Sequence, residues 1–135
     1  MKNKLSLLVL LLCAAQLGAD TCLAPTNPIP VRNACGSARD MVGDPVAGLK
    51  LQLLAKNTVV AETTTDANGK FMFATQAPGD YDLASASEEW RVFWPIRVEN
   101  PKSENKCKHP LEVRLSVGSC GNSVSKKGYH PKFSR

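Results

Sequence analysis

Apolar and polar residues alternate one by one in several short segments, and this pattern constrains the fold more than any other feature of the chain. A period of two places successive side chains on opposite faces of a strand. Turn-forming stretches such as Asp66–Gly69 and Ala77–Asp80 separate the segments. Pro95 interrupts one segment, which predicts an edge strand or a bend because proline lacks the amide donor. Outside the first 19 residues no window has the 3.6-residue period of a helix. We therefore predict an all-β sandwich, with strands in six segments: Leu49–Leu53, Val59–Thr65, Phe71–Phe73, Tyr81–Leu83, Trp90–Val98 and Leu111–Val117.

The first 19 residues have the layout of a secretory signal peptide. The stretch MKNKLSLLVLLLCAAQLGA contains two lysines, a run of leucines and then small residues. Its apolar run is shorter than the roughly 20 residues that a membrane span requires, so an uncleaved membrane anchor is the second choice. The sequence has no second hydrophobic span, and we expect no transmembrane span after the signal is removed. Cleavage after Ala19 and cleavage after Ala15 both suit the small-residue rule. The sequence therefore predicts a secreted or periplasmic protein.

Four cysteines remain when Cys13 leaves with the signal: Cys22, Cys35, Cys107 and Cys120. An even number of cysteines in a small exported domain predicts two disulfide bonds. Four cysteines allow three connectivities, and the spacing does not choose among them. No two of them form a Cys-x-x-Cys pair, so the spacing does not suit a zinc site. We predict no metal site and no cofactor.

The chain after the signal divides into three parts of different composition. Residues 20–34 form a proline-rich lead-in, residues 35–120 form the sandwich, and residues 121–135 form a basic C-terminal tail. The formal net charge of +5 falls to +3 when the two lysines of the signal leave. The tail contains no acidic residue, so it either is a solvated extension or contacts an anionic partner. Charge this sparse predicts no nucleic-acid partner. The candidate anion contacts are Lys126, Lys127, Lys132 and Arg135.

Three motifs follow one another in the centre of the chain: PVAG at residues 45–48, TTTDANGKFMF at residues 63–73 and PGDYDL at residues 78–83. In this order and spacing they resemble the carboxypeptidase regulatory-like domain over about residues 38–85, and residues 111–117 resemble its closing strand. The resemblance implies a seven-stranded antiparallel, prealbumin-like (Ig-like) sandwich, in a family often grouped with carbohydrate-binding-like folds. It also implies a bacterial secreted protein of one domain, whose motif residues hold the fold and do not catalyse.

The residues that most often carry catalysis are scarce in this chain. His109 and His130 are the two histidines, and each lies in a polar segment without a supporting motif. A catalytic triad requires a base oriented by an acid and a nucleophile within reach. We therefore predict no catalytic residue and no enzyme activity. A transthyretin-like hydrolase, which has a related sandwich, is the third alternative, although its histidine and arginine motifs are not found.

The aromatic residues Trp90, Phe93 and Trp94 are the candidate ligand-binding residues. Exposed rings on a sandwich can stack on sugar rings, which would make the protein a carbohydrate-binding module. The alternative is that both indoles fill the core, because Val92 and Ile96 share their face, and Phe93 is then the exposed ring. The sequence favours an exported, non-catalytic module with a recognition or structural role at the cell envelope. Its expected partner is a protein or a cell-envelope glycan.

Overall fold

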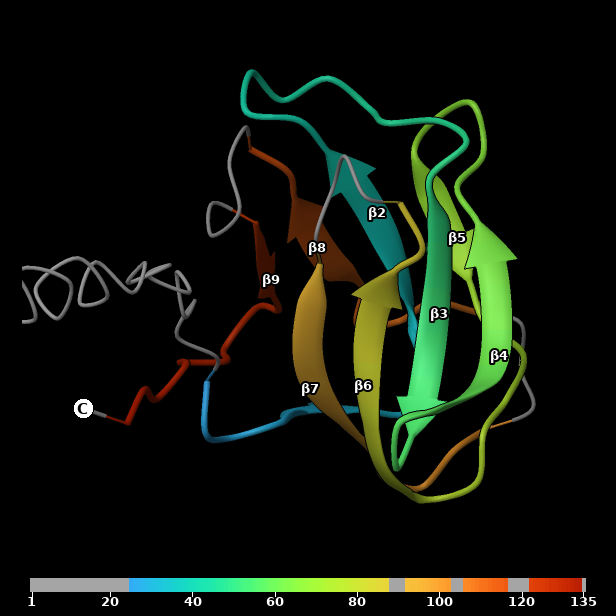
Figure 1. Cartoon of the computed structure of the whole chain (residues 1–135), viewed down its shortest axis with the longest axis vertical. Coiled ribbons are helices and arrows are strands. Elements are labelled where there is room, and N and C mark those ends of the chain that lie inside the picture. The colour runs from blue at the N-terminus through green and yellow to red at the C-terminus, as the bar shows by residue number, and fades with distance from the viewer. Residues whose placement is uncertain (1–24, 88–91, 103–105, 117–121, 135) are drawn as a thin grey trace, which may run out of the picture.

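The computed structural model describes residues 25–87, 92–102, 106–116 and 122–134. The predicted signal peptide, Cys22, Cys120, Trp90 and Arg135 lie outside these residues. In the described part of the chain there are nine strands and no helix, and the strands form two sheets that pack face to face (Figure 1). The predicted all-β sandwich is confirmed.

The first sheet contains five strands in the order β1-β7-β6-β3-β4. β1 runs parallel to β7, and the other pairs are antiparallel. Lys56 and Asn57 join β3 to β4 with φ values of 49° and 65°, the left-handed backbone of a tight two-residue hairpin turn. The bounds are β1 (Ile29–Val31), β7 (Phe93–Val98), β6 (Gly79–Ser85), β3 (Lys50–Ala55) and β4 (Thr58–Thr64).

The second sheet contains four strands in the order β5-β2-β8-β9. β2 lies between β5, which is antiparallel to it, and β8, which is parallel to it. Gly36 of β2 faces Leu111 of β8, and a Cβ at residue 36 would lie 1.9 Å from the Leu111 carbonyl oxygen. Glycine is therefore required where these two backbones approach. The bounds are β5 (Lys70–Met72), β2 (Cys35–Arg39), β8 (Leu111–Arg114) and β9 (Ser123–Ser125).

The strand count and the pairing differ from the prediction of seven antiparallel strands. The structure has nine strands in two mixed sheets. Period-two alternation reports which face of a strand is buried and carries no information on the direction of its neighbour. β1 lies in the segment expected to be a lead-in, and β9 lies in the segment expected to be a tail. The sandwich therefore extends beyond residues 35–120 at both ends.

The core lies between the two sheets and uses the side chains that the alternation selected. Leu51 and Leu53 of β3, Leu83 of β6 and Ile96 of β7 are completely buried. They meet Leu111 and the other inward residues of the second sheet in one apolar cluster. Burial of this apolar surface is the main stabilising contribution to such a fold.

Pro95 does not lie on an edge strand, because β7 has β6 on one side and β1 on the other. The pairing with β1 begins only at Ile96, and Pro95 faces Asp82 of β6. β7 therefore gains its second neighbour directly after the residue that cannot donate a hydrogen bond. The edge position is taken by β1 itself, where Pro30 is exposed between two buried residues, as expected for proline in a sheet.

The turn predicted at residues 66–69 is present. The Asp66 carboxylate accepts hydrogen bonds from the amides of Asn68 and Lys70, each at 2.9 Å, and Gly69 has φ of 73°. Thr65, directly before the turn, is a buried polar residue. Its hydroxyl accepts a hydrogen bond from the Leu49 amide at 2.8 Å and donates one to the Val46 carbonyl at 2.6 Å. Phe71 and Phe73, after the turn, are both buried, and their rings meet edge to face.

Candidate functional site

The aromatic candidates separate into one buried and one exposed ring. Trp94 is 8% exposed and belongs to the core, so its indole cannot stack on a sugar at the surface. Phe93, the next residue of β7, is 54% exposed on the outer face of the sheet. Trp90 lies outside the described residues. The structure thus leaves Phe93 as the aromatic candidate that can be placed on the surface.

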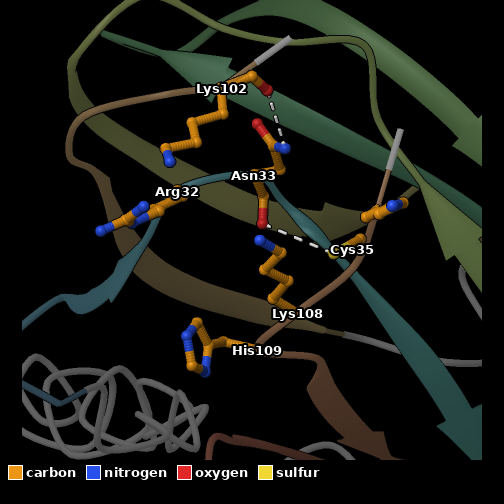
Figure 2. A pocket seen from close by; sticks show the side chains of 7 residues that line it. Arg32, Asn33, Cys35, Lys102, Lys108 and His109 are labelled. Carbon is orange, nitrogen blue, oxygen red and sulfur yellow. Dashed lines mark hydrogen bonds between the residues drawn. The ribbon is translucent and has the colours of Figure 1, made fainter. Parts of the chain in front are cut away.

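A basic pocket lies where the β1–β2 connection meets the two ends of the β7–β8 connection. Arg32 and Asn33 join β1 to β2, Lys102 follows β7, and Lys108 and His109 precede β8. Figure 2 shows Arg32 and Lys102 extending from two different segments on one side of Asn33, with Lys108 and His109 on the adjoining wall. The pocket is lined by Arg32, Asn33, Cys35, Lys102, Lys106, Lys108 and His109.

Two cross-links hold the walls of this basic pocket together. A disulfide joins Cys35, the first residue of β2, to Cys107 in the loop before β8, with a Cα–Cα distance of 5.9 Å. The Asn33 side-chain amide donates a hydrogen bond of 3.0 Å to the Lys102 carbonyl. The Sγ of Cys35 also lies 3.7 Å from the Asn33 carbonyl oxygen, which is a packing contact because a disulfide sulfur has no proton to donate. Both cross-links join the β1–β2 connection to the loops that carry the lysines.

The basic pocket is small, and its side chains carry one sign of charge. Its volume is about 30 Å³, far below the several hundred Å³ that a small-molecule substrate usually occupies. One arginine, three lysines and a histidine line it, and no carboxylate of the described residues does so. It can therefore hold one anionic group that projects from a larger ligand. Guanidinium and ammonium groups bind carboxylate, sulfate and phosphate oxygens by charge-assisted hydrogen bonds.

Sequence reasoning missed this basic pocket. It predicted Cys35 and Cys107 as disulfide cysteines without pairing them, and treated His109 as an ordinary loop residue. The signal available in the sequence was the lysine-rich stretch at residues 102–108 around Cys107. Its significance depends on the pairing of Cys107 with Cys35, since that bond brings the stretch to Arg32.

The predicted basic tail is attached to the N-terminal segment along most of its described length. Tyr129 packs against the core, and its hydroxyl donates a hydrogen bond of 2.6 Å to the Asn27 carbonyl. The Lys132 amide donates to the Asn27 side-chain oxygen at 2.6 Å, and the Thr26 amide donates to the Lys132 carbonyl at 2.6 Å. Figure 1 shows the two terminal segments meeting beside β9. We call this arrangement, residues 25–27 with residues 129–133, the terminal clasp.

The described residues contain neither a metal-binding cluster nor a helix that could span a membrane. Among the described ranges, no group of three or more metal-ligating side chains is close enough to hold a metal ion. The same ranges hold no helix of the length and apolarity needed to cross a membrane.

The family of the chain follows from its central strands. Residues 37–114, from β2 to the end of β8, match the family described as the BOS complex subunit NOMO1-like, second beta sandwich domain. The match covers more than half of the chain. The chain belongs to this family. No curated protein sequence matches the chain. The NOMO1-like match does not confirm the carboxypeptidase regulatory-like resemblance, and the bacterial origin stays a prediction.

A solved hydrolase structure shares the fold of this NOMO1-like sandwich. The 5-hydroxyisourate hydrolase of Klebsiella pneumoniae superposes with a TM-score of 0.54 at 17% identity, over 71% of this chain and 98% of the hydrolase. An (S)-allantoin synthase has a TM-score of 0.46 at 12% identity, over 76% of this chain and 45% of the synthase. The first of these supports the prealbumin-like sandwich and shows the fold alone.

The hydrolase comparison corrects the prediction that the protein is not an enzyme. That prediction used the scarcity of catalytic residue types and the structural role of the central motifs. The hydrolase is an enzyme whose chain is covered almost completely by this sandwich. A sandwich of this architecture is therefore compatible with catalysis, and the prediction was wrong.

Proposed function

We propose that the protein is an exported recognition module of the cell envelope, which holds an anionic group of its partner in the basic pocket. The observation that carries the proposal is the convergence of Arg32, from the β1–β2 connection, with Lys102 and His109, from the two ends of the β7–β8 connection, onto one small cavity. Like charges repel, so a chain gains no stability from collecting them. An anion in the cavity would offset that repulsion and make charge-assisted hydrogen bonds.

The Cys35–Cys107 disulfide supports the exported setting. Structural disulfides persist in oxidising compartments and are rare in the reducing cytosol. The same bond holds the lysine-bearing loop in place before a ligand binds, so the loop loses less conformational entropy on binding. Secretion to the exterior or to the periplasm follows as part of the proposal, together with a partner protein or glycan that presents a carboxylate, sulfate or phosphate group.

The test is a titration of the protein with inorganic sulfate and with inorganic phosphate, in which the amide chemical shifts are measured by NMR at each concentration. We expect saturable shifts at Arg32, Lys102, Lys106 and His109, and their loss in the double variant Arg32→Gln/Lys102→Gln. Lys70→Gln is the matched control, because it removes a positive charge from β5, away from the pocket lining. Shifts that are scattered over the surface, or that persist in the double variant, would show that the basic pocket is not an anion site.

A second candidate function is the stacking of a neutral glycan on Phe93. The observation in its favour is the 54% exposure of this ring on β7. A glycan array that compares the unmodified protein with Phe93→Ala separates the two candidates. Binding of neutral glycans that Phe93→Ala abolishes supports stacking, whereas an array without neutral binders removes this candidate.

A further inference from the structure

The basic pocket continues into two neighbouring hollows, so that three concave sites follow one another over the surface. The second hollow, of about 260 Å³, shares Arg32 and His109 with the basic pocket. The third, of about 380 Å³, shares Pro30 and Lys126 with the second. Their linings therefore touch in sequence from the disulfide loop to the C-terminal segment. We call these three sites together the basic track.

Positive charge extends along the whole basic track. The pocket end has Arg32 and the lysines around Cys107, the middle has Lys126, and the far end has Lys127. Among the described lining residues, Glu99 is the single acid. Glu104 belongs to residues 103–105, which the structure does not describe. Cations arranged in a row complement a ligand whose anionic groups repeat along a chain.

The far end of the basic track is held in place against the rest of the molecule. The Lys126 ammonium donates a hydrogen bond to the Pro30 carbonyl of β1. Tyr129, three residues on, is anchored through its hydroxyl to Asn27, and burial raises the pKa of this hydroxyl above its usual range. The hydroxyl therefore stays protonated at neutral pH and keeps donating. The C-terminal cations are thus positioned by the terminal clasp and do not have to be ordered by the ligand.

We infer that the basic track binds a linear acidic polysaccharide, with carboxylate or sulfate groups repeating along it. The inference rests on the proposed function, because the basic pocket binds one of these anionic groups. It adds the chemical class of the ligand and the path of the ligand over the surface. An exported protein meets such polymers outside the cytosol. Single-stranded nucleic acid fits less well, because Tyr129 is the single phenylalanine, tyrosine or tryptophan ring among the described lining residues, and one ring does not stack successive bases. A lipid surface would require apolar side chains beside the cations, and neither Phe93 nor Phe133, the exposed phenylalanines of the described residues, is in the lining.

Two physical properties follow from a ligand that spans the basic track. Affinity increases with the length of the polysaccharide until all three sites are filled, because the later contacts form within one complex. Affinity also decreases steeply with salt concentration, because each paired anionic group releases a counterion. A single anionic group binds only at the pocket end and shows neither the length dependence nor the steep salt dependence.

The experiment measures the affinity of size-fractionated heparin oligosaccharides, from disaccharide to decasaccharide, by calorimetry at two salt concentrations. Three variants are compared: Arg32→Gln/Lys102→Gln at the pocket end, Lys126→Gln/Lys127→Gln at the far end, and Lys70→Gln as the control. Amide spectra and thermal unfolding confirm that each variant is folded. Lys127→Gln alone keeps the contact between Lys126 and Pro30, and so gives a far-end variant that removes one charge without removing that contact.

We expect affinity to increase with oligosaccharide length in the unmodified protein. The far-end double variant should lose about tenfold or more for the long oligosaccharides and nothing for the disaccharide, with Lys127→Gln intermediate. The pocket variant should lose affinity for every length. Equal affinity for all lengths, or no effect of the far-end variants, would overturn the basic track and leave the proposed anion pocket standing. Absence of saturable sulfate shifts in the unmodified protein, in the titration described above, would remove the pocket itself. Tighter binding of single-stranded DNA of equal charge would overturn the polysaccharide assignment.

Discussion

At the scale of single residues, the hydroxyl of Thr65 joins two parts of the chain that the sequence keeps apart. It accepts a hydrogen bond from the amide of Leu49 and donates one to the carbonyl of Val46. Both backbone groups lie in the connection that leads into β3. A buried backbone group without a partner costs about 1–3 kcal/mol, so this hydroxyl decides whether the connection docks on the strand.

We predict that Thr65→Val lowers the free energy of unfolding by about 2 kcal/mol, because the methyl group keeps the volume and removes both hydrogen bonds. Chemical denaturation with urea measures the change. Thr63→Val is the control, because the described contacts include no side-chain hydrogen bond of Thr63. This substitution should change the free energy of unfolding by less than about 0.5 kcal/mol. Equal effects of the two substitutions would show that the hydroxyl is unimportant.

Single residues also show which features of the fold could be predicted from the sequence and which could not. The turn at Asp66–Gly69 could be predicted because each of its residue types has a local reason to be there. Thr65 could be placed on the inner face by alternation, but its partners lie in a loop whose position depends on the whole sandwich. Gly36 lies inside β2, where a glycine indicates a close backbone approach, but no strand was predicted at these residues. The strand that approaches it, β8, begins 75 residues later at Leu111, so it could not be identified from local pattern.

At the scale of the elements, the strands that could be predicted are those that alternate over several residues. β3, β6, β7 and β8 contain clear alternation and lie where the sequence placed them. β1 and β9 have three residues each, too few for a period to be distinguished from chance. They are strands because neighbouring elements offer them a free edge, which is a property of the assembled sheet. The basic pocket was missed for a related reason, since its walls meet only when β1, β2 and β8 are in place.

The disulfide is the element-level bond whose removal has the clearest consequence. We predict that Cys35→Ala/Cys107→Ala lowers the free energy of unfolding by roughly 3–4 kcal/mol, because the loop that the bond closes is long. The bond joins residues 72 positions apart. The double variant should also weaken sulfate binding, because the lysine-bearing loop is no longer fixed beside Arg32. Urea denaturation and the amide titration measure the two effects.

The control for the disulfide is peptide mapping without reduction, which should recover Cys35 linked to Cys107 in the unmodified protein. If the chain holds a second disulfide, elimination leaves Cys22 and Cys120 as its partners. A double variant that keeps full stability would contradict the structural role of the bond. A variant that loses stability and keeps sulfate binding would separate the disulfide from the pocket.

At the scale of the whole molecule, the terminal clasp closes the chain upon itself. Asn27 lies at the centre of the clasp, because the side chain and the carbonyl of Asn27 form hydrogen bonds with Tyr129, His130 and Lys132. Without the clasp, the segment after β9 would keep, among the described contacts, a local backbone hydrogen bond from Tyr129 to Lys126 and the contact of Lys126 with Pro30. The basic C-terminal segment is therefore part of the folded sandwich, although its composition alone is typical of a solvated tail.

We predict that Asn27→Ala releases residues 129–133 and leaves the two sheets intact. Amide hydrogen exchange should show lost protection in that segment and unchanged protection in β3 and β6. The free energy of unfolding should fall by about 1–2 kcal/mol, since the lost hydrogen bonds are largely exposed. Protection that disappears throughout the protein would contradict this prediction, because it would make the clasp a condition for folding.

The two parallel pairings have a consequence for the time course of folding. β1 has no neighbour in its sheet until β7 is available, and β2 lacks one of its two neighbours until β8 is available. Contacts between such distant parts of a chain form slowly, because a large loop has to close before they contribute. The β3–β4 hairpin can form early, whereas the sandwich cannot close before residues 93–114 have emerged. A nascent chain of this topology therefore stays open during synthesis, which is the state in which a polypeptide can be threaded through an export channel.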